Sequence, residues 1–418
     1  MKARNWLLVA VGLGSLSWMA GAADWPQWRG PHRDGISSET GLLKEWPKEG
    51  PKLLWQVKDL GGGYSTPSVV GARIYLLNSK SKDEEVVAAL DVKDGKEVWS
   101  APLGKSGPNM GPQYPGARST PTVVGDVLYA LGSDGDLACL ETAKGEVRWR
   151  KNLRSDFGGQ PGKWAYAESP LIDGDVLVCT PGGKEATVVA LNRKTGDLIW
   201  KFPSPDADTS GYASAFVLEV GGVKQFVQFM EKGLVGLDAK TGKLLWSYGK
   251  TAEGSPANIP TPVAHDGYVY SAAGLTGGGL VHLKIDKGEI TAEPGYFDKN
   301  LPNCIGGAVQ VGDYLYGANG IAGLMCVEFT TGNVKWKEKS LGAGAVCVAD
   351  GRLYFHGENG DVALVEATPD GYHEKGRFTP ADQPNHGQRQ MAWAYPVVAD
   401  GRLYIRDLGS LWCYEIKM

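Results

Sequence analysis

One phrase recurs along this chain and limits what it can fold into. Its clearest copy spans residues 235–246 and reads VGLDAKTGKLLW, an apolar strand end followed by a tight glycine turn and a second strand. The other copies keep the spacing between glycine and tryptophan: Gly95 with Trp99, Gly145 with Trp149, Gly196 with Trp200, and Gly332 with Trp336. Such regular recurrence predicts a repeat architecture rather than a series of unrelated domains.

Each repeat opens with a second recurring segment, a short apolar strand that often follows Thr-Pro or Ser-Pro. Eight openings occur at a mean spacing of about 47 residues, which is typical of four-stranded propeller blades. They lie at residues 66–71, 120–125, 169–174, 214–217, 261–263, 307–312, 345–348 and 395–398. Glycine accounts for 59 of 418 residues, about twice its average usage, and is concentrated in turns. The sequence therefore predicts an all-β fold, an eight-bladed β-propeller of four-stranded antiparallel blades.

The last repeat indicates how the ring closes. It has only three strands, at residues 395–398, 403–406 and 411–416, before the chain stops at Met418. A strand-like run around Trp55 resembles the final strand of a repeat but follows no earlier strands. We expect this N-terminal strand to complete the last blade, so that residues 24–418 form one closed propeller domain. An open solenoid is the alternative architecture.

Residues 1–23 are predicted to be a signal peptide. Lys2 and Arg4 precede an apolar stretch at residues 6–19, and small residues follow at 20–23. The stretch is shorter than the ~20 residues that span a bilayer, which favours cleavage over a membrane anchor. No cysteine lies near the cleavage site, so a bacterial lipid anchor is not supported. We expect a periplasmic or secreted protein without a transmembrane segment after cleavage.

The segment that follows contains Trp25 and Trp28 outside any repeat. An aromatic-rich terminus is usually held by burial, so we expect both side chains to pack on the outside of the propeller. Ligand binding by these two tryptophans is the alternative interpretation.

The phrase resembles the repeat of the pyrroloquinoline-quinone (PQQ) propellers, the quinoprotein alcohol dehydrogenase-like superfamily, which includes BamB-like exported propellers. The resemblance covers residues 24–418, although the fifth and seventh repeats, at 283–288 and 366–371, keep the turn and lack the tryptophan. It implies that the repeat tryptophans dock between adjacent blades and have a structural role. These are Trp55, Trp99, Trp149, Trp200, Trp246 and Trp336.

Function is expected where the repeats differ. The connections from a fourth strand to the next first strand, and the turns from second to third strands, all lie at one end of the ring, here called the top face. The long irregular segments of the chain fall in these connections and are rich in aromatic and polar residues. The candidate ligand-binding residues are Tyr114, Arg118, Trp164, Tyr166, Glu168, Tyr212, Asn258, Asn303, Arg389 and Trp393, with Phe157 and Tyr395 in the same segments. Alternatively, these loops only cover and solubilise the top face.

Three classes of function remain open on this reasoning. The preferred prediction is a non-catalytic scaffold that binds a protein or peptide of the cell envelope through its top face, with no cofactor. The second is a PQQ-dependent oxidoreductase that acts on an alcohol or sugar. The third is a non-catalytic binder of a carbohydrate or another small ligand.

A PQQ site requires cations for three carboxylates, a stacking aromatic ring, a calcium ion and a carboxylate base. Arg118, Arg389, Trp393, Trp164 and Glu168 are the right residue types. The resemblance itself argues the other way, since the superfamily's alcohol dehydrogenases are longer and typically carry an adjacent cysteine pair beside the cofactor. This sequence has no Cys-Cys pair and no recognisable calcium loop.

Composition and motifs argue against other functions. A net charge of −4 without any Lys/Arg run is atypical of a nucleic-acid-binding protein. The sequence has no Gly-x-Ser-x-Gly, His-Glu-x-x-His or Walker motif, and its six histidines are scattered singly, so no catalytic residue or metal site is predicted. The six cysteines are expected to be mostly buried thiols. We expect a monomer.

Overall fold

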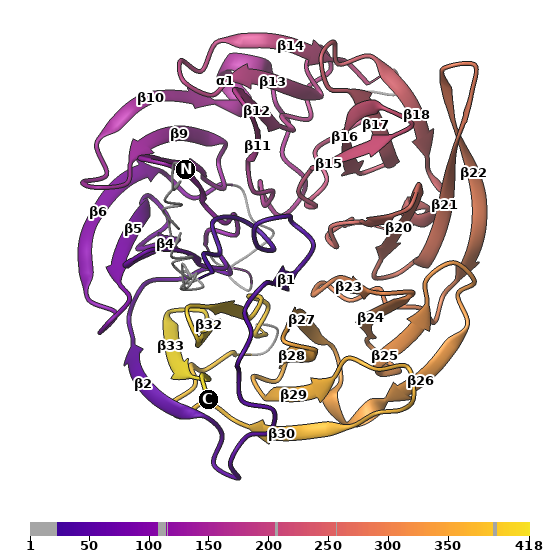
Figure 1. The fold of residues 1–418 in the computed structure, drawn as a ribbon. Helices are drawn as coiled ribbons and strands as arrows, with labels where there is room; N and C mark the ends of the chain where they lie inside the picture. The colour runs from indigo at the N-terminus through magenta and orange to yellow at the C-terminus, as the bar shows by residue number, and fades with distance from the viewer. Residues whose placement is uncertain (1–22, 108–113, 115, 205–207, 256, 388–390) are drawn as a thin grey trace, which may run out of the picture.

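The protein is a ring of eight antiparallel sheets arranged like the blades of a propeller (Figure 1). The computed structural model describes residues 23–418 except 108–113, 115, 205–207, 256 and 388–390. The predicted eight-bladed, four-stranded fold is confirmed. The predicted signal peptide lies outside the described residues, apart from Ala23.

The blades follow one another in chain order. Blade one consists of β3 (Ser68–Val70), β4 (Arg73–Ser79), β5 (Glu85–Asp91) and β6 (Glu97–Gly104), and blade two of β7 (Thr122–Val124), β8 (Val127–Leu131), β9 (Asp136–Glu141) and β10 (Val147–Asn152). Blade three consists of β11 (Leu171–Asp173), β12 (Val176–Cys179), β13 (Val188–Asn192) and β14 (Leu198–Phe202), and blade four of β15 (Phe216–Val220), β16 (Val223–Met230), β17 (Gly233–Asp238) and β18 (Leu244–Tyr248).

Blade five consists of β19 (Val263–His265), β20 (Tyr268–Ala273), β21 (Gly277–Asp286) and β22 (Glu289–Asp298), and blade six of β23 (Ala308–Val311), β24 (Tyr314–Asn319), β25 (Gly323–Glu328) and β26 (Val334–Glu338). Blade seven consists of β27 (Gly344–Ala349), β28 (Arg352–Gly357), β29 (Val362–Glu366) and β30 (Glu374–Phe378), and blade eight of β31 (Val397–Ala399), β32 (Arg402–Asp407), β33 (Ser410–Glu415) and β2 (Lys52–Val57). The short helical elements are α1 (Leu153–Phe157), η1 (Lys250–Ala252) and η2 (Lys339–Leu341).

The N-terminal strand closes the ring as predicted. β2 is the outermost strand of the eighth blade and pairs antiparallel with β33, so that Trp55 lies opposite Cys413. The first and last parts of the chain are therefore joined in one sheet, and the two ends of the ring do not remain open.

The repeat tryptophans join each blade to the next. The indole N–H of Trp55 donates to the carbonyl of Val92, that of Trp99 to Thr142, and that of Trp149 to Arg193. Trp200 and Trp336 make the corresponding bonds to Ala239 and Thr368. Val92, Thr142, Arg193 and Ala239 each directly follow the polar residue that ends a third strand, and Thr368 lies one residue further on. One phrase thus supplies both the donor and the acceptor of successive contacts.

The glycine of the phrase lies beneath a ring of the preceding blade. A Cβ placed on Gly145 would lie 2.6 Å from Trp99, and one on Gly242 would lie 2.4 Å from Trp200. Both residues also have φ near +70°. Glycine is therefore required at these turns for two independent reasons, backbone conformation and the close approach of an indole.

Three blades depart from this pattern. In the fifth blade Tyr296 replaces the tryptophan, since its hydroxyl donates to the carbonyl of Phe329 at 2.8 Å and its ring covers Gly332. In the seventh blade Gly376 pairs with Leu364, and Trp46 from the N-terminal segment covers this glycine. Trp246 of the fourth blade bonds Gln225 of its own blade instead of the next.

The segment before β2 fills the axis of the ring, which corrects the expectation that Trp25 and Trp28 pack outside. In Figure 1 this indigo segment crosses the centre of the ring, where β1 (Ile36–Ser37) pairs in parallel with β27. The amides of Val69 and Val123, on the innermost strands of blades one and two, donate to the carbonyls of Trp25 and Pro26, both at 2.8 Å.

Two arginines extend this contact to other blades. Arg29 Nη2 donates to the carbonyl of Ala308 at 2.6 Å, and Arg33 Nη2 donates to that of Ser169 at 2.8 Å. The physical reason is that innermost strands carry unpaired backbone groups on their axial edge, and a buried edge of this kind requires hydrogen-bond partners. We call residues 24–37 the axial segment.

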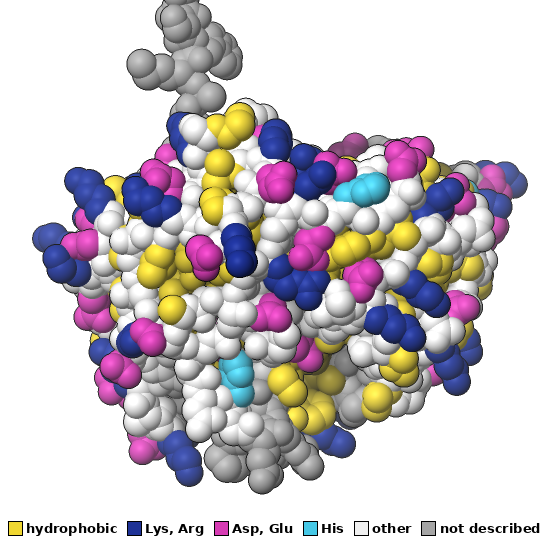
Figure 2. Space-filling view, turned by 90° about the horizontal axis from the view of Figure 1, so that it is seen from below, with side chains coloured by type: hydrophobic (Ala, Val, Ile, Leu, Met, Phe, Trp, Pro, Cys, Tyr) yellow, Lys and Arg dark blue, Asp and Glu magenta, His cyan; other side chains and the backbone are white. Residues whose placement is uncertain are grey.

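All six cysteines are buried free thiols, as expected. Among the described residues, no helix is long and apolar enough to cross a bilayer. On the side of the ring shown in Figure 2, basic and acidic side chains are interspersed. A pocket lies at the top of the axis.

Candidate functional site

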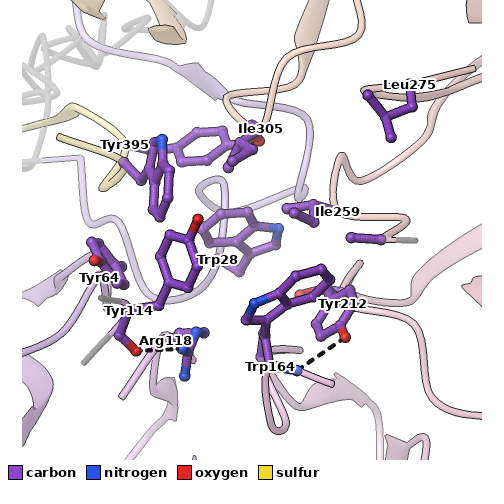
Figure 3. Close-up of a pocket in the computed structure, with 14 residues that line it drawn as sticks. Trp28, Tyr64, Tyr114, Arg118, Trp164, Tyr212, Ile259, Leu275, Ile305 and Tyr395 are labelled. Atoms are coloured by element: carbon purple, nitrogen blue, oxygen red, sulfur yellow. Dashed lines mark hydrogen bonds between the residues drawn. The ribbon is translucent and has the colours of Figure 1, made fainter. Parts of the chain in front are cut away.

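A pocket of about 460 Å³ lies where the top-face connections meet at the end of the axis (Figure 3). Its walls come from the connections that lead into blades one to six and eight, with Leu275 from the β20–β21 turn and Trp28 from the axial segment. The lining residues are Trp28, Tyr64, Tyr114, Arg118, Trp164, Ala167, Tyr212, Ser214, Ala257, Ile259, Leu275, Ile305, Trp393 and Tyr395. We call this the aromatic pocket.

Five of the aromatic rings form a continuous series around the wall. The ring of Trp393 lies 5.1 Å from Tyr64 and is stacked with Tyr114 at 5.4 Å between centroids. Tyr114 in turn meets Trp164 edge-on at 6.4 Å, and Trp164 lies 5.9 Å from Tyr212. These rings come from five different connections, so the wall exists only because the ring fold brings those connections together.

Trp28 forms part of the pocket from the axial side. Its indole N–H donates to the hydroxyl of Thr261 at 2.8 Å, and its ring meets Tyr395 edge-on at 4.5 Å. The Tyr395 hydroxyl donates to the carbonyl of Ile305 at 2.8 Å, and burial raises its pKa to about 12. The axial segment thus closes this end of the axis with an aromatic surface held by two blades.

Arg118 is the one charged residue among the described lining residues. Its guanidinium donates to the carbonyl of Tyr114 at 2.7 Å (Figure 3). It also donates to the carbonyl of Gly116 at 2.9 Å, so both acceptors belong to the same connection as Arg118 itself. Burial lowers the pKa of Arg118, and the group stays a cation at neutral pH because the ordinary arginine pKa is so high. The pocket is therefore apolar with a single positive charge.

The sequence-predicted residues fall into four groups. Tyr114, Arg118, Trp164, Tyr212 and Trp393 line the aromatic pocket. Asn258 lines a smaller polar pocket beside it, which shares Tyr212 and Ala257 with the first. Arg389 lies outside the described residues.

Tyr166, Glu168 and Asn303 are buried between blades and do not line the aromatic pocket. The Tyr166 hydroxyl donates to the carbonyl of Pro181 at 2.8 Å. Asn303 accepts from Asn319 Nδ2 at 3.1 Å and donates to the carbonyl of Gly274 at 3.3 Å. The side chains of Tyr166 and Asn303 therefore form hydrogen bonds within the fold and do not contribute to the pocket wall.

Glu168 is fully buried beside the axial segment. Its carboxylate accepts from the amide and hydroxyl of Thr180 and from Gln228 Nε2 at 3.2 Å. Burial raises its pKa to about 7, opposed by these hydrogen bonds and by the nearby charge of Arg33. Such a carboxyl can hold or release a proton near neutral pH, but it is not among the residues that line the pocket.

Sequence reasoning missed Tyr64, and it considered ligand binding by Trp28 only as the alternative to packing outside the propeller. Tyr64 occupies the connection before β3, which is equivalent to the connections that carry Tyr114 and Trp164, so the repeat spacing contained the signal needed to find it. Trp28 belongs to no repeat, and nothing in the sequence places it at the axis.

The described lining does not match the donor set of a PQQ site. It supplies stacking rings but one cation for three carboxylates, and it contains no carboxylate to act as a base or to bind calcium. Among the described residues, no group of three or more His, Cys, Asp or Glu side chains is placed to hold a metal ion. We therefore derive no chemical step through this cofactor.

The fold and its repeat define the class of protein: an eight-bladed propeller of PQQ-like repeats. A family model described as outer membrane protein assembly factor BamB matches residues 35–111 and 82–338, well over half of the chain. The chain belongs to this family.

Curated relatives carry the same description. BamB of Salmonella typhimurium is 26% identical over 121 residues, which are 28% of this chain and 27% of that protein. BamB of Burkholderia pseudomallei is 30% identical over 95 residues, 22% of this chain and 23% of the relative. The matches thus span about a quarter of the length of these relatives.

Solved structures share the fold at low sequence identity. The crystal structure of BamB from Moraxella catarrhalis has a TM-score of 0.60 at 16% identity, covering 87% of this chain and 97% of that one. Quinohemoprotein alcohol dehydrogenase from Comamonas testosteroni has a TM-score of 0.52 at 14% identity, covering 94% and 80%. Because an assembly factor and an alcohol dehydrogenase both adopt this fold, function must be argued from the pocket.

Proposed function

We propose that this protein is an exported, non-catalytic scaffold of the cell envelope that binds an apolar segment of a protein partner in the aromatic pocket. The observation that carries the proposal is the composition of the pocket, in which seven Trp and Tyr side chains surround a space with one charge. The family match supports a protein-binding role, since its members are named for outer membrane protein assembly. The predicted signal peptide supports export.

The size of the pocket fits this kind of ligand. About 460 Å³ accommodates one or two large side chains of a peptide but not a folded domain. Each aromatic or large aliphatic side chain that leaves water for such a pocket contributes roughly 2–3 kcal/mol of hydrophobic free energy. The described wall comes from seven connections anchored in one closed ring, so the protein itself should lose little conformational entropy when the ligand binds.

Binding of short labelled peptides tests the proposal. The probe is a fluorescein-labelled peptide with a Trp-Leu pair flanked by serine and glycine, and fluorescence anisotropy gives its dissociation constant. We expect Trp393→Ala and Trp164→Ala to weaken binding at least tenfold, because each removes a wall of the pocket. Tyr268→Ala is the matched control, since this aromatic side chain stacks on His282 and lies outside the pocket; it should change the constant less than twofold.

Two results would overturn the proposal. One is the absence of binding by any apolar peptide, or binding that the pocket variants leave unchanged. The other is binding of PQQ in the presence of calcium, lost in Arg118→Ala and accompanied by dye-linked oxidation of an alcohol or sugar, which would assign an oxidoreductase instead.

A further inference from the structure

A second pocket of about 190 Å³ adjoins the aromatic pocket on the top face. The two share Tyr212 and Ala257 as a common wall, so one extended ligand can occupy both. An extended peptide rises about 3.3 Å per residue, so two or three residues advance the chain by roughly 7–10 Å. The other lining residues are Pro161, Gly162, Lys163, Thr209, Ser210, Gly211, Glu231 and Asn258. We call this the polar pocket.

Asn258 contributes a buried hydrogen-bond acceptor without a partner. The residue is 1% exposed, and its Nδ2 donates to the carbonyls of Met230 at 2.7 Å and Glu231 at 2.8 Å. Two carbonyl acceptors fix the orientation of the amide, because a flipped side chain would place Oδ1 against both of them. Oδ1 therefore faces away from these carbonyls, and among the described residues it accepts no hydrogen bond.

The remaining polar groups also favour a ligand that donates hydrogen bonds. Glu231 is exposed, and its carboxylate accepts from the Thr209 hydroxyl. The Ser210 hydroxyl donates to the carbonyl of Gln160 at 3.3 Å, which leaves its oxygen able to accept. Asp208, adjacent to this wall, accepts from the amide of Lys232. Among the described residues that line the pocket the one cation is Lys163, which is exposed at its edge, and outside the lining Lys232 lies near Asp208.

We propose that the polar pocket binds a basic side chain, arginine or lysine, of the same partner segment whose apolar side chain enters the aromatic pocket. This inference rests on the proposed function and specifies the partner: a peptide in which a large apolar residue lies within two or three positions of a basic one. A guanidinium or ammonium group carries several donors and no acceptor, which matches the free Asn258 Oδ1 and the Glu231 carboxylate.

A set of matched peptides tests the inference. Four labelled peptides share the Trp-Leu pair and differ at one position two residues away, which holds Arg, Lys, Gln or Glu; a second set places this residue on the other side of the pair. In one of the two sets we expect the Arg peptide to bind at least fivefold more tightly than the Gln peptide, with the Glu peptide weakest. Glu231→Gln should reduce the preference for Arg over Gln to less than twofold.

Lys163→Gln is the matched control, because it removes the opposite charge from the same pocket. It should preserve or increase the preference for Arg. Equal binding of the Arg and Gln peptides that is still lost in Trp393→Ala would refute this inference and leave the proposed function standing. A preference for the Glu peptide that Lys163→Gln abolishes would also refute it, and failure of every peptide to bind would refute both.

Discussion

At the scale of single residues, a repeat tryptophan stabilises the ring through its buried ring and its indole N–H together. Trp200 is 8% exposed, donates to Ala239 of the next blade and covers Gly242. We expect Trp200→Ala to lower the free energy of unfolding by about 3–5 kcal/mol, since it leaves a cavity between two blades. Chemical denaturation followed by circular dichroism measures this difference.

The neighbouring Ile199 provides the control for this substitution. It lies in the same strand and is 49% exposed, so Ile199→Ala should cost less than about 1 kcal/mol. Similar losses for the two variants would show that the strand, rather than the contact between blades, sets the stability at this position.

The buried carboxyl of Glu168 makes a second prediction at this scale. Its pKa is about 7 in the folded protein, above the value of about 4.3 for an unfolded glutamate. Folding therefore favours the protonated form of Glu168. The stability that this protonation contributes is present in full below about pH 4 and is lost as the pH rises through 7. Between pH 5 and pH 8, Glu168 alone should lower the free energy of unfolding by about 2–3 kcal/mol.

Urea unfolding at pH 5 and pH 8 checks this sign. Glu168→Gln removes the titrating group. The variant should be less stable than the wild type at both pH values, because an amide N–H then faces the Thr180 donors. The difference in free energy of unfolding between pH 5 and pH 8 should nevertheless shrink. The exposed Glu231→Gln variant should retain the wild-type difference. An unchanged pH dependence in Glu168→Gln would contradict the assignment.

At the scale of elements, the glycine turns of the third and fourth strands are set by a neighbouring blade as well as by their own geometry. Gly242 and Gly71 both have positive φ, but a Cβ on Gly242 meets Trp200 at 2.4 Å, whereas one on Gly71 meets nothing within 4 Å. Gly71→Ala should therefore cost about 1–2 kcal/mol from backbone strain alone. Gly242→Ala should cost about 1–3 kcal/mol more, from the displaced indole.

Calorimetric melting of the two glycine variants separates these contributions. Combining Gly242→Ala with Trp200→Ala gives a further check, because the excess cost should disappear once the ring is absent. If the excess persists in the double variant, the turn itself and not the docking contact determines the requirement for glycine.

The connections between blades illustrate what sequence could predict at this scale. Their lengths and residue types indicated the top face, and five of the predicted residues do line the aromatic pocket. Tyr166, Glu168 and Asn303 lie in the same connections but turn inward between blades. Side-chain direction in an irregular segment depends on local backbone dihedrals and neighbouring blades, and no periodic pattern encodes it.

At the scale of the whole molecule, the N-terminal region has two separable roles. Residues 24–37 fill the axis, and β2 closes the ring. A chain that begins at residue 38 should remain a closed monomer with a lower melting temperature and a wider aromatic pocket, since Trp28 is removed. A chain that begins at residue 58 should also lose β2, expose the edge of β33 and self-associate.

Light scattering coupled to size-exclusion chromatography distinguishes the two truncated proteins. Self-association of both to the same extent would mean that the axial segment, rather than the shared eighth blade, holds the ring together. Monomeric behaviour of the chain lacking β2 would show that strand pairing with β33 is not what closes it.

The sequence by itself determined the repeat, the number of blades and the closure of the ring. The repeat and the number of blades follow from local patterns, since the glycine turn, the alternating strands and the docking tryptophan all lie within one repeat of about 47 residues. Closure follows from counting strands, since the last repeat lacks a fourth strand and the run around Trp55 supplies one. Only the tertiary structure decided the course of the axial segment and the composition of the aromatic pocket. Trp28 meets Thr261 and Tyr395, more than 200 residues away in the chain. A contact of that kind depends on where the closed ring leaves unpaired strand edges, which no local pattern records.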